Sequence, residues 1–366
     1  MRTELVDQTL PTVVLLFGGQ SGEHQISCAT AGGVLRAINP EQWNVVPVGI
    51  APTGQWVPMP NDLAADGGYT VEVGQRRVGF IPGSPMMLEY QVAEGEAPVD
   101  GTVTTIGKVD VVFPLLHGPF GEDGTVQGLL EFSHVNYVGC GVASSAVCQD
   151  KHLTKTVLDH AGIDVGKWVS FSKDQWEDRT RHFEDQIAKL GYPVFVKPCR
   201  AGSSLGVSRV SSPTDLLAAV EEAQRHDPRV IVEAAVVGRE VECGVLVTAD
   251  GEVHTSAVGE IRTLGDDFYD YETKYFDSEA VALDCPANLP EGVTERIQRE
   301  AERAFRALEG EGISRVDFFY NNETGRLVLN EVNTMPGFTP FSMYPVMFQE
   351  AGLAYNELVN ALLQEA

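Results

Sequence analysis

Residues 315–333 read RVDFFYNNETGRLVLNEVN, and they predict a β-hairpin whose turn is the polar segment NNETG at 321–325. Side chains in a strand alternate between two faces, so Arg315 and Asp317 share one face, as do Glu331 and Asn333. A turn centred near residue 323 pairs odd-numbered residues with odd-numbered ones. We therefore expect these four side chains to converge on one face of the hairpin.

This face has the chemistry of a metal site. Asp317, Glu331 and Asn333 offer two carboxylates and an amide oxygen without Cys or His, which are hard oxygen ligands suited to Mg²⁺ or Mn²⁺. Mg²⁺ held in this way usually keeps waters and bridges nucleotide phosphates. The alternative is a solvated face with cross-strand pairs such as Arg315 with Glu331. The hairpin itself leaves both interpretations open.

The first 140 residues alternate strand and helix signals, which predicts an open parallel α/β sheet with loops at the strand ends. The continuous apolar run at 109–116 is typical of a strand buried on both faces of such a sheet. Residues 51–107 are rich in Gly, Pro and acidic side chains, and they predict loops and a hairpin inserted into this domain, with alternating runs such as 69–73. The other predicted elements here are strands at 12–17 and 44–50 and a helix at about 23–38.

The rest of the chain divides into a small α+β unit, residues 141–234, and a C-terminal part, residues 235–366. The C-terminal part contains a clear amphipathic helix over 293–308, followed by the hairpin and a last helix. The remaining predicted elements are helices at about 144–161 and 214–225 and strands at 193–197, 206–210, 230–233, 240–248 and 253–260.

Composition restricts the possible functions. The chain has 366 residues, of which 43% are hydrophobic and 21% charged, as in ordinary globular proteins of two or three domains. Its 26 basic and 52 acidic residues give a net charge of −26, which argues against nucleic-acid or membrane partners. The six cysteines predict free thiols rather than disulfides or a zinc site. With no signal sequence and no long apolar stretch, we expect a soluble cytoplasmic protein.

Three loops follow predicted strands and could bind anions. Lys197 ends a strand and precedes the small residues 201–206, whose backbone N–H groups could wrap phosphate oxygens; the alternative is a plain hairpin loop. Gly18 to His24 link a strand to a helix N-terminus, where Glu23 could also simply favour the helix dipole. The loop at 116–124 lies at the usual ligand edge of an open sheet, although a lone histidine such as His117 is more often structural.

Two further segments are ambiguous. Residues 139–144, GCGVAS, half-match a dinucleotide fingerprint but lack its third glycine, so they give little support for a nicotinamide cofactor. Residues 268–275, FYDYETKY, interleave aromatic and charged side chains without helix or strand periodicity. They could form a mobile lid or a packed surface loop.

Together these segments resemble the D-alanine–D-alanine ligase family of ATP-grasp enzymes. The match runs through nearly the whole chain, except the insert at 51–107, and seven motifs in sequence order make it highly specific. The motifs are GGQSGE at 18–23, LHG to GEDG at 116–124, DK at 150–151, VKP to GSS at 196–204, FYDYETKY at 268–275, RVD at 315–317 and EVNTMPG at 331–337.

The resemblance implies a three-part ATP-grasp architecture and ATP-dependent ligation of two D-alanines through an acyl phosphate. It implies that Asp317, Glu331 and Asn333 bind two Mg²⁺ or Mn²⁺ ions, and that Arg315 and the Gly337 backbone face the developing oxyanion. The implied ATP-binding residues are Lys151 and Lys197 on the phosphates, Ser203, Ser204 and Lys274, Glu233 and Ala234 at adenine, and Glu240 at ribose. A lysine that many relatives carry after the glutamate is absent here, where Ala234 and Ala235 follow Glu233.

The resemblance also implies how the amino acids are held. Glu23, with His117 nearby, would take the first ammonium, and Lys274 and Ser342 the second carboxylate. Glu23, Ser203 and Tyr275 would form a hydrogen-bonded trio that ties the lid shut, and Tyr275 is similar to the dipeptide-forming members. The family tendency implies a homodimer. Alternatives are a D-lactate or D-serine ligase of the same family, a non-catalytic ATP-binding regulator, and the weakly supported dehydrogenase.

Overall fold

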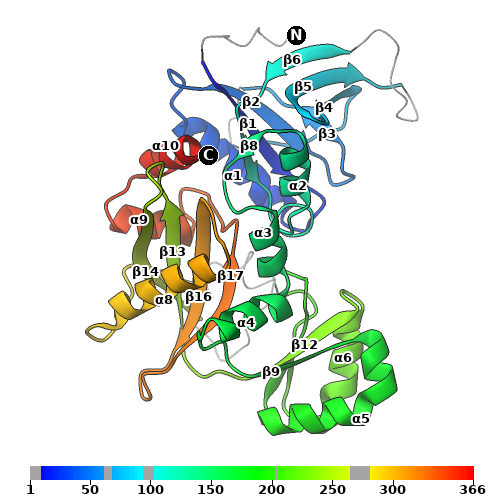
Figure 1. The fold of residues 1–366 in the computed structure, drawn as a ribbon, viewed down its shortest axis with the longest axis vertical. Helices are drawn as coiled ribbons and strands as arrows, with labels where there is room; N and C mark the ends of the chain where they lie inside the picture. Colours follow the sequence, from blue (N-terminus) through cyan, green and yellow to red (C-terminus); the bar gives the residue numbers. More distant parts are fainter. Residues whose placement is uncertain (1–9, 62–67, 94–102, 203, 264–280) are drawn as a thin grey trace.

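The structure is a computed structural model that describes residues 10–61, 68–93, 103–202, 204–263 and 281–366. Figure 1 shows an N-terminal part at the top, a C-terminal part at the middle left and a smaller unit below, with helices α3 and α4 running between them. The predicted parts, 1–140, 141–234 and 235–366, each hold one of the three larger sheets, and their limits remain predictions.

The N-terminal sheet has the strand order β3-β2-β1-β7-β8, with β1, β2, β7 and β8 parallel. All seven residues of β1 are buried, which explains its unbroken apolar sequence. The parallel α/β prediction is confirmed. The elements are β1 (Thr12–Gly18), α1 (His24–Ala37), β2 (Asn44–Ile50), β3 (Trp56–Pro58), β7 (Val111–Leu115), α2 (Thr125–Phe132) and β8 (Asn136–Tyr137).

The insert is more regular than expected. In place of one hairpin, it forms a three-stranded antiparallel sheet of β4 (Arg76–Ile81), β5 (Ser84–Gln91) and β6 (Thr104–Lys108). The alternating run at 69–73 is not a strand; Tyr69 instead stacks on Phe17, with ring centroids 4.5 Å apart. Burial against the N-terminal core therefore explains its apolar residues.

The helix predicted over 144–161 is two helices, α3 (Val142–Gln149) and α4 (Lys151–His160). Asp150 separates them in an extended conformation, and its carboxylate accepts hydrogen bonds from the amides of His152 (3.0 Å) and Leu153 (3.1 Å). This N-cap begins a new helix, so the apolar periodicity alone could not reveal the break.

The small unit below contains the antiparallel sheet β11-β10-β12-β9. Its long helix α5 (Lys173–Leu190) has a capping box between Ser172 and Gln175 and buries only Trp176, Phe183 and Ile187. The sequence analysis missed α5 because so few of its residues are apolar. The other elements are β9 (Trp168–Ser172), β10 (Val194–Pro198), β11 (Ser208–Val210), the 3₁₀ turn η1 (Pro213–Asp215), α6 (Leu216–Gln224) and β12 (Arg229–Ala234).

The C-terminal part contains the sheet β15-β14-β13-β16-β17, in which every pairing is antiparallel. Its amphipathic helix, α8 (Val293–Ala307), buries Ile297, Ala301 and Phe305 against the sheet, as predicted. The other elements are β13 (Arg239–Val247), β14 (Val253–Thr263), β15 (Val281–Asp284), β16 (Ile313–Tyr320), β17 (Leu327–Asn333), α9 (Met343–Glu350) and α10 (Tyr355–Glu365).

The C-terminal helix joins the first and last parts of the chain. Helix α10 lies beside α1 (Figure 1), and Leu358, Val359 and Leu362 share one buried core with residues of β1 and α1. The Asn360 amide donates to Ala37 O at 3.2 Å. Among the described helices, none is long and apolar enough to cross a membrane.

Candidate active site

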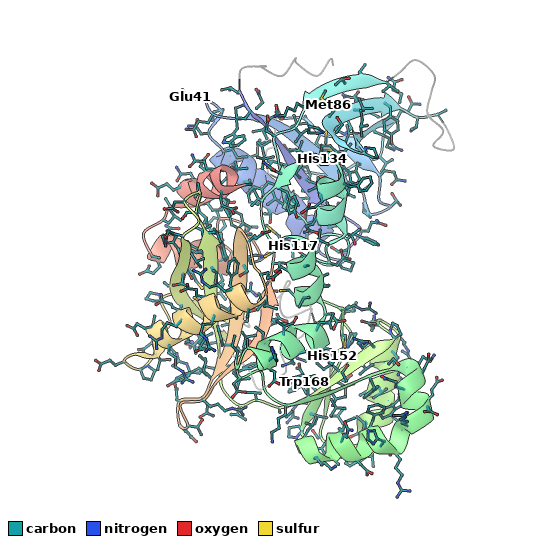
Figure 2. The ribbon with its side chains drawn as sticks, in the orientation of Figure 1. Glu41, Met86, His117, His134, His152 and Trp168 are labelled. Carbon is teal, nitrogen blue, oxygen red and sulfur yellow. The ribbon has the colours of Figure 1, made fainter. Side chains whose placement is uncertain are left out.

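A cavity of about 770 Å³ lies where the three parts meet. His117, labelled in Figure 2, lies in this central region. The predicted site residues that line the cavity come from every part of the chain: Glu23, His117, Lys151, Lys197, Ser204, Glu233, Ala234, Glu240, Arg315, Asp317, Glu331, Asn333, Gly337 and Ser342. Thus the loops that the sequence analysis treated separately open into one space.

The polar face of the hairpin forms one wall. Arg315 lies opposite Asn333 and Asp317 opposite Glu331, so the predicted convergence of the four side chains is confirmed. A bulge after Asp317 shifts the register, and Arg315 is therefore not the cross-strand partner of Glu331. The Arg315 guanidinium instead donates to both oxygens of Asp317, at 2.8 and 2.7 Å.

Glu242 of β13 is a member of this wall that the sequence analysis missed. Its carboxylate lies 3.2 Å from Arg315 Nε, and its side chain is only 4% exposed. Burial alone would lower the pKa of Arg315, but Asp317 and Glu242 raise it well above its ordinary value. Arg315 is therefore a fixed cation between two carboxylates. Glu240 and Glu242 lie two residues apart in one strand and therefore share a face, which is the sequence signal that could have revealed Glu242.

The donor set on this wall fits a hard divalent cation. Asp317 and Glu331 supply carboxylate oxygens, and Asn333 donates its amide nitrogen to Asp317 at 2.9 Å, which turns its amide oxygen to the other side. Within the described ranges, no three His, Cys, Asp or Glu side chains are grouped as a metal site. A cation bound here would therefore depend on further oxygens, such as those of a nucleotide phosphate.

Three lysines and one glutamate form a buried charge cluster beside this wall. Glu233 accepts an ion pair from Lys197 at 2.7 Å and another from Lys155 at 3.1 Å. Burial raises the pKa of Glu233, but the two lysines outweigh it and lower that pKa to about 2. Burial also lowers the pKa of Lys151, whereas Glu233 raises that of Lys197 despite burial. The sequence analysis identified Lys151, Lys197 and Glu233 but not Lys155.

The loop after β10 is held at its base by Asp227. This carboxylate, 3% exposed, accepts from the Arg200 amide and from both Nε and an Nη of the Arg200 guanidinium at 2.7–2.9 Å. Lys151 Nζ donates to Ala201 O in the same loop at 2.7 Å. Ser204, in a left-handed conformation with φ 58°, lines the cavity. These contacts hold the two ends of a segment of mainly small residues at the cavity, and backbone N–H groups of such a segment suit phosphate oxygens.

The two N-terminal loops meet at Glu23 and His117. A Cβ atom at Gly118 would lie 3.5 Å from the Glu23 carboxylate, which places the two loops side by side. Burial lowers the pKa of His117 more than Glu23 raises it, so the ring is neutral and Nδ1–H donates to Met335 O at 3.1 Å. The buried Nε2 is then an acceptor with no hydrogen-bond partner among the described residues.

Glu122, in the loop at 116–124, is a further carboxylate here and is half-buried. Its side chain accepts from the Gly118 amide, and burial together with the Glu23 carboxylate raises its pKa to about 8. The sequence analysis quoted Glu122 within a motif but assigned it no role. The raised pKa favours the neutral form of Glu122, so the Glu23 carboxylate and the Nε2 acceptor of His117 are the groups at this place in the cavity that suit an ammonium group.

Gly337 and Ser342, which also line the cavity, approach each other closely. A Cβ at Gly337 would lie 3.3 Å from Ser342 Oγ, and Ser342 also shares a hydrogen bond of 2.7 Å with Thr339 Oγ1. Ser342 occupies the N-cap position of α9. A helix N-terminus with a hydroxyl beside it favours a carboxylate or an oxyanion.

Aromatic and aliphatic side chains lie beside the charge cluster in the cavity lining and suit a flat ring. Phe195, Phe319 and Leu329 line the cavity together with Glu233 and Glu240. The Ala234 amide already donates to Lys167 O at 3.0 Å. The predicted backbone contact of Ala234 with a base would therefore have to use a backbone atom of Ala234 other than this nitrogen.

Some expectations fall outside the described residues, namely those for Ser203, Lys274, Tyr275 and the lid segment 268–275. The half-matched fingerprint has a packing role: a Cβ at Gly312 would come within 2.8 Å of Gly139 N, and Gly141 precedes α3. All six cysteines are free, as predicted; four are buried and two, Cys148 and Cys285, are half-buried.

Comparisons with known proteins agree along the whole chain. Residues 12–140 match the family described as D-ala D-ala ligase N-terminus, and residues 157–364 match D-ala D-ala ligase C-terminus. The chain is 49% identical to the D-alanine–D-alanine ligase of Kineococcus radiotolerans, covering 98% of this chain and 97% of that protein. It is 48% identical to that of Pseudarthrobacter chlorophenolicus, covering 97% and 94%.

Solved structures show the same likeness. The VanG D-Ala:D-Ser ligase from Enterococcus faecalis superposes with a TM-score of 0.81 at 35% identity, covering 97% of this chain and 99% of that one. The D-alanine–D-alanine ligase from Coxiella burnetii gives a TM-score of 0.79 at 31% identity, covering 97% and 93%.

Proposed function

The chain belongs to the D-alanine–D-alanine ligase family, and from that premise we propose that it joins two D-alanines, converting ATP to ADP and phosphate. The product would be D-alanyl-D-alanine for peptidoglycan precursors. The observation that carries the proposal is the single cavity in which the hairpin wall, the lysine cluster and the ammonium-binding loops face one another. The use of ATP favours a cytoplasmic location.

The first step transfers the γ-phosphoryl group of ATP to the carboxylate of the first D-alanine. One carboxylate oxygen forms a bond to phosphorus, the bond from phosphorus to the bridging oxygen breaks, and ADP leaves. Lys151 and Lys197 balance the phosphate charge, and backbone groups of the 201–206 loop hold the oxygens. Asp317, Glu331 and Asn333 would hold Mg²⁺ or Mn²⁺, which would neutralise charge on the phosphates.

The second step forms the peptide bond. The amine of the second D-alanine attacks the acyl carbon, which creates a tetrahedral oxyanion; the bond from carbon to the phosphate oxygen then breaks, and the phosphate leaves with the original carboxylate oxygen and takes up the proton that the amine loses. Arg315 is fixed by Asp317 and Glu242, so it is preorganised to stabilise that oxyanion together with the Gly337 N–H.

The substrates are oriented by their charged ends. Glu23 and the Nε2 acceptor of His117 favour the ammonium of the first D-alanine. Ser342, with Lys274 from the lid segment, would take the carboxylate of the second. The Glu23, Ser203 and Tyr275 trio and the homodimer remain predictions from the sequence.

Ligation of D-alanine to D-serine is a second candidate, because one of the structures similar to this chain is a D-Ala:D-Ser ligase. Both candidates can be tested by incubating the protein with ATP, Mg²⁺ and D-alanine, alone or with D-serine or D-lactate, and measuring ADP and product mass. We expect D-alanyl-D-alanine to dominate in every mixture. Dominance of the mixed D-serine or D-lactate product would favour that specificity, and tight ATP binding without any ligated product would favour a regulator.

A further inference from the structure

Lys155 has a position that the proposed reaction does not explain. It lies on α4, one turn after Lys151, and its side chain is only 6% exposed. Its ammonium contacts two groups, Val165 O at 2.6 Å and Glu233 Oε1 at 3.1 Å. Burying a lysine costs folding free energy unless its charge is paired, and the Lys155 ammonium is paired with the Glu233 carboxylate. This pairing points to a role for Lys155 at Glu233.

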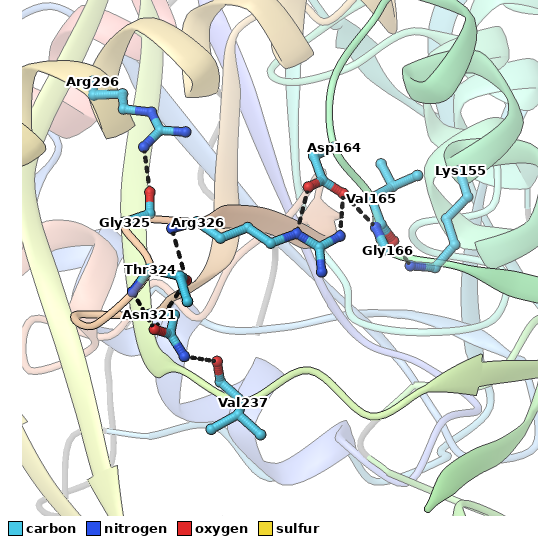
Figure 3. Close-up of polar contacts among 10 residues, drawn as sticks. All are labelled: Lys155, Asp164, Val165, Gly166, Val237, Arg296, Asn321, Thr324, Gly325 and Arg326. Atoms are coloured by element: carbon cyan, nitrogen blue, oxygen red, sulfur yellow. Dashed lines mark hydrogen bonds and ion pairs between the residues drawn. The ribbon is translucent and has the colours of Figure 1, made fainter. Parts of the chain in front are cut away.

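The backbone partner of Lys155 is itself fixed. Figure 3 shows Lys155 beside Val165, next to Asp164, whose two oxygens accept from the Arg326 guanidinium at 2.8 and 2.9 Å. The turn before Arg326, residues 321–325, is held by two hydrogen bonds: the Thr324 amide donates to Asn321 Oδ1 at 2.9 Å, and Arg296 donates to Gly325 O at 2.6 Å. Lys155 therefore reaches Glu233 from a rigid support.

Lys197 differs from Lys155 in this respect. Its side chain is 17% exposed and lines the cavity, and Lys197 is the next-to-last residue of β10, just before the loop at 201–206. In the proposed reaction Lys197 binds a phosphate, and Lys155, which is held by Val165 O, would then be the cation that stays beside Glu233. Its ammonium favours the ionised form of the Glu233 carboxylate, and an ionised carboxylate can only accept hydrogen bonds.

We propose that Lys155 is a positioning residue for nucleotide specificity: it fixes the Glu233 carboxylate as an acceptor beside Phe195 in the cavity and thereby selects a base with an amino group. Adenine presents an amino donor at its 6-position, whereas guanine presents a carbonyl acceptor there. A carbonyl facing a buried carboxylate leaves two acceptors unpaired, and buried unpaired polar groups are strongly disfavoured. This inference rests on the proposed ATP-dependent function.

The test compares ATP with GTP in the D-alanine reaction, and ADP with GDP in equilibrium binding, for the wild type, Lys155→Met and Lys155→Arg. We expect Lys155→Met to raise KM for ATP about tenfold, change kcat by less than about threefold and reduce the preference for ATP over GTP about tenfold. Lys155→Arg should stay within about threefold of the wild type. The exposed Lys189→Met serves as the matched control.

Two further outcomes would overturn the inference. An equal loss of kcat/KM for ATP and GTP in Lys155→Met would indicate a structural role only. A wild type that uses GTP as well as ATP would refute the specificity while leaving the ligase function intact, whereas a wild type that forms no ligated product would refute the proposed function itself.

A double variant covers the case in which Lys155→Met does not fold because it leaves a buried unpaired carboxylate. Lys155→Met with Glu233→Gln removes both charges, so we expect a folded protein, and the amide can donate to a carbonyl as well as accept from an amine. Its preference for ATP over GTP should fall at least about tenfold. Retention of the wild-type preference would contradict the proposal.

Discussion

Glu331 is the residue on which the proposed metal site depends most directly. It lies opposite Asp317 on the hairpin wall and supplies one of the two carboxylates assigned to the metal. We expect Glu331→Ala to lower kcat/KM at least about 1000-fold, because a divalent ion contributes several kcal/mol of charge stabilisation to phosphoryl transfer. The measurement is ADP release in a coupled assay with ATP, Mg²⁺ and D-alanine.

The matched control is Glu323→Ala, which removes an exposed carboxylate from the turn of the same hairpin. Its activity should stay within about twofold of the wild type, since isolated surface substitutions have small effects. Near-normal turnover of Glu331→Ala would rule out the metal assignment.

At the scale of single elements, Asp150 both separates two helices and begins the second. We expect Asp150→Ala to lower the free energy of unfolding by about 1 kcal/mol through loss of the N-cap, and to raise KM for ATP because Lys151 is the next residue. Asp150→Asn, which keeps an accepting oxygen, is the control. Equal stability of the two variants in urea unfolding would contradict the capping role.

Asp227 supports a second element, the loop after β10. Burial raises its pKa, but the hydrogen bonds from Arg200 and Arg229 outweigh burial, so the folded pKa lies below the ordinary 3.8. Its stabilisation is therefore present above that value and is lost as pH falls through the folded pKa. We expect Asp227→Asn to lower the melting temperature at pH 7 and to approach the wild type near pH 3. A difference that does not depend on pH would contradict this account.

The sequence predicts elements best where the pattern is local. The hairpin at 315–333 was predictable because period-two alternation and the turn lie within one stretch, and α8 because its apolar stripe is unbroken. Helix α5 was missed because its charged sequence buries only three side chains, and the break at Asp150 because an aspartate fits a helix and a cap alike. Lys155 was missed because its partner Glu233 comes from a distant strand.

At the scale of the molecule, α10 connects the two ends of the chain. Leu362 is fully buried in the core that α10 shares with α1 and β1. We expect Leu362→Ala to lower the free energy of unfolding by about 2–5 kcal/mol, as for other buried leucines. Gln364→Ala, on the exposed side of the same helix, should change it by less than about 0.5 kcal/mol. Equal effects in chemical denaturation would contradict the packing role.

The proposed function depends on one cavity that brings ATP and two amino acids together and activates a carboxylate as an acyl phosphate. The most direct test uses D-alanine labelled with ¹⁸O in its carboxylate, with ATP and Mg²⁺, and measures the isotope in the released phosphate by mass spectrometry. The account predicts one ¹⁸O atom per phosphate, because the attacking carboxylate oxygen leaves with phosphorus. Unlabelled phosphate, or label found in AMP, would contradict it.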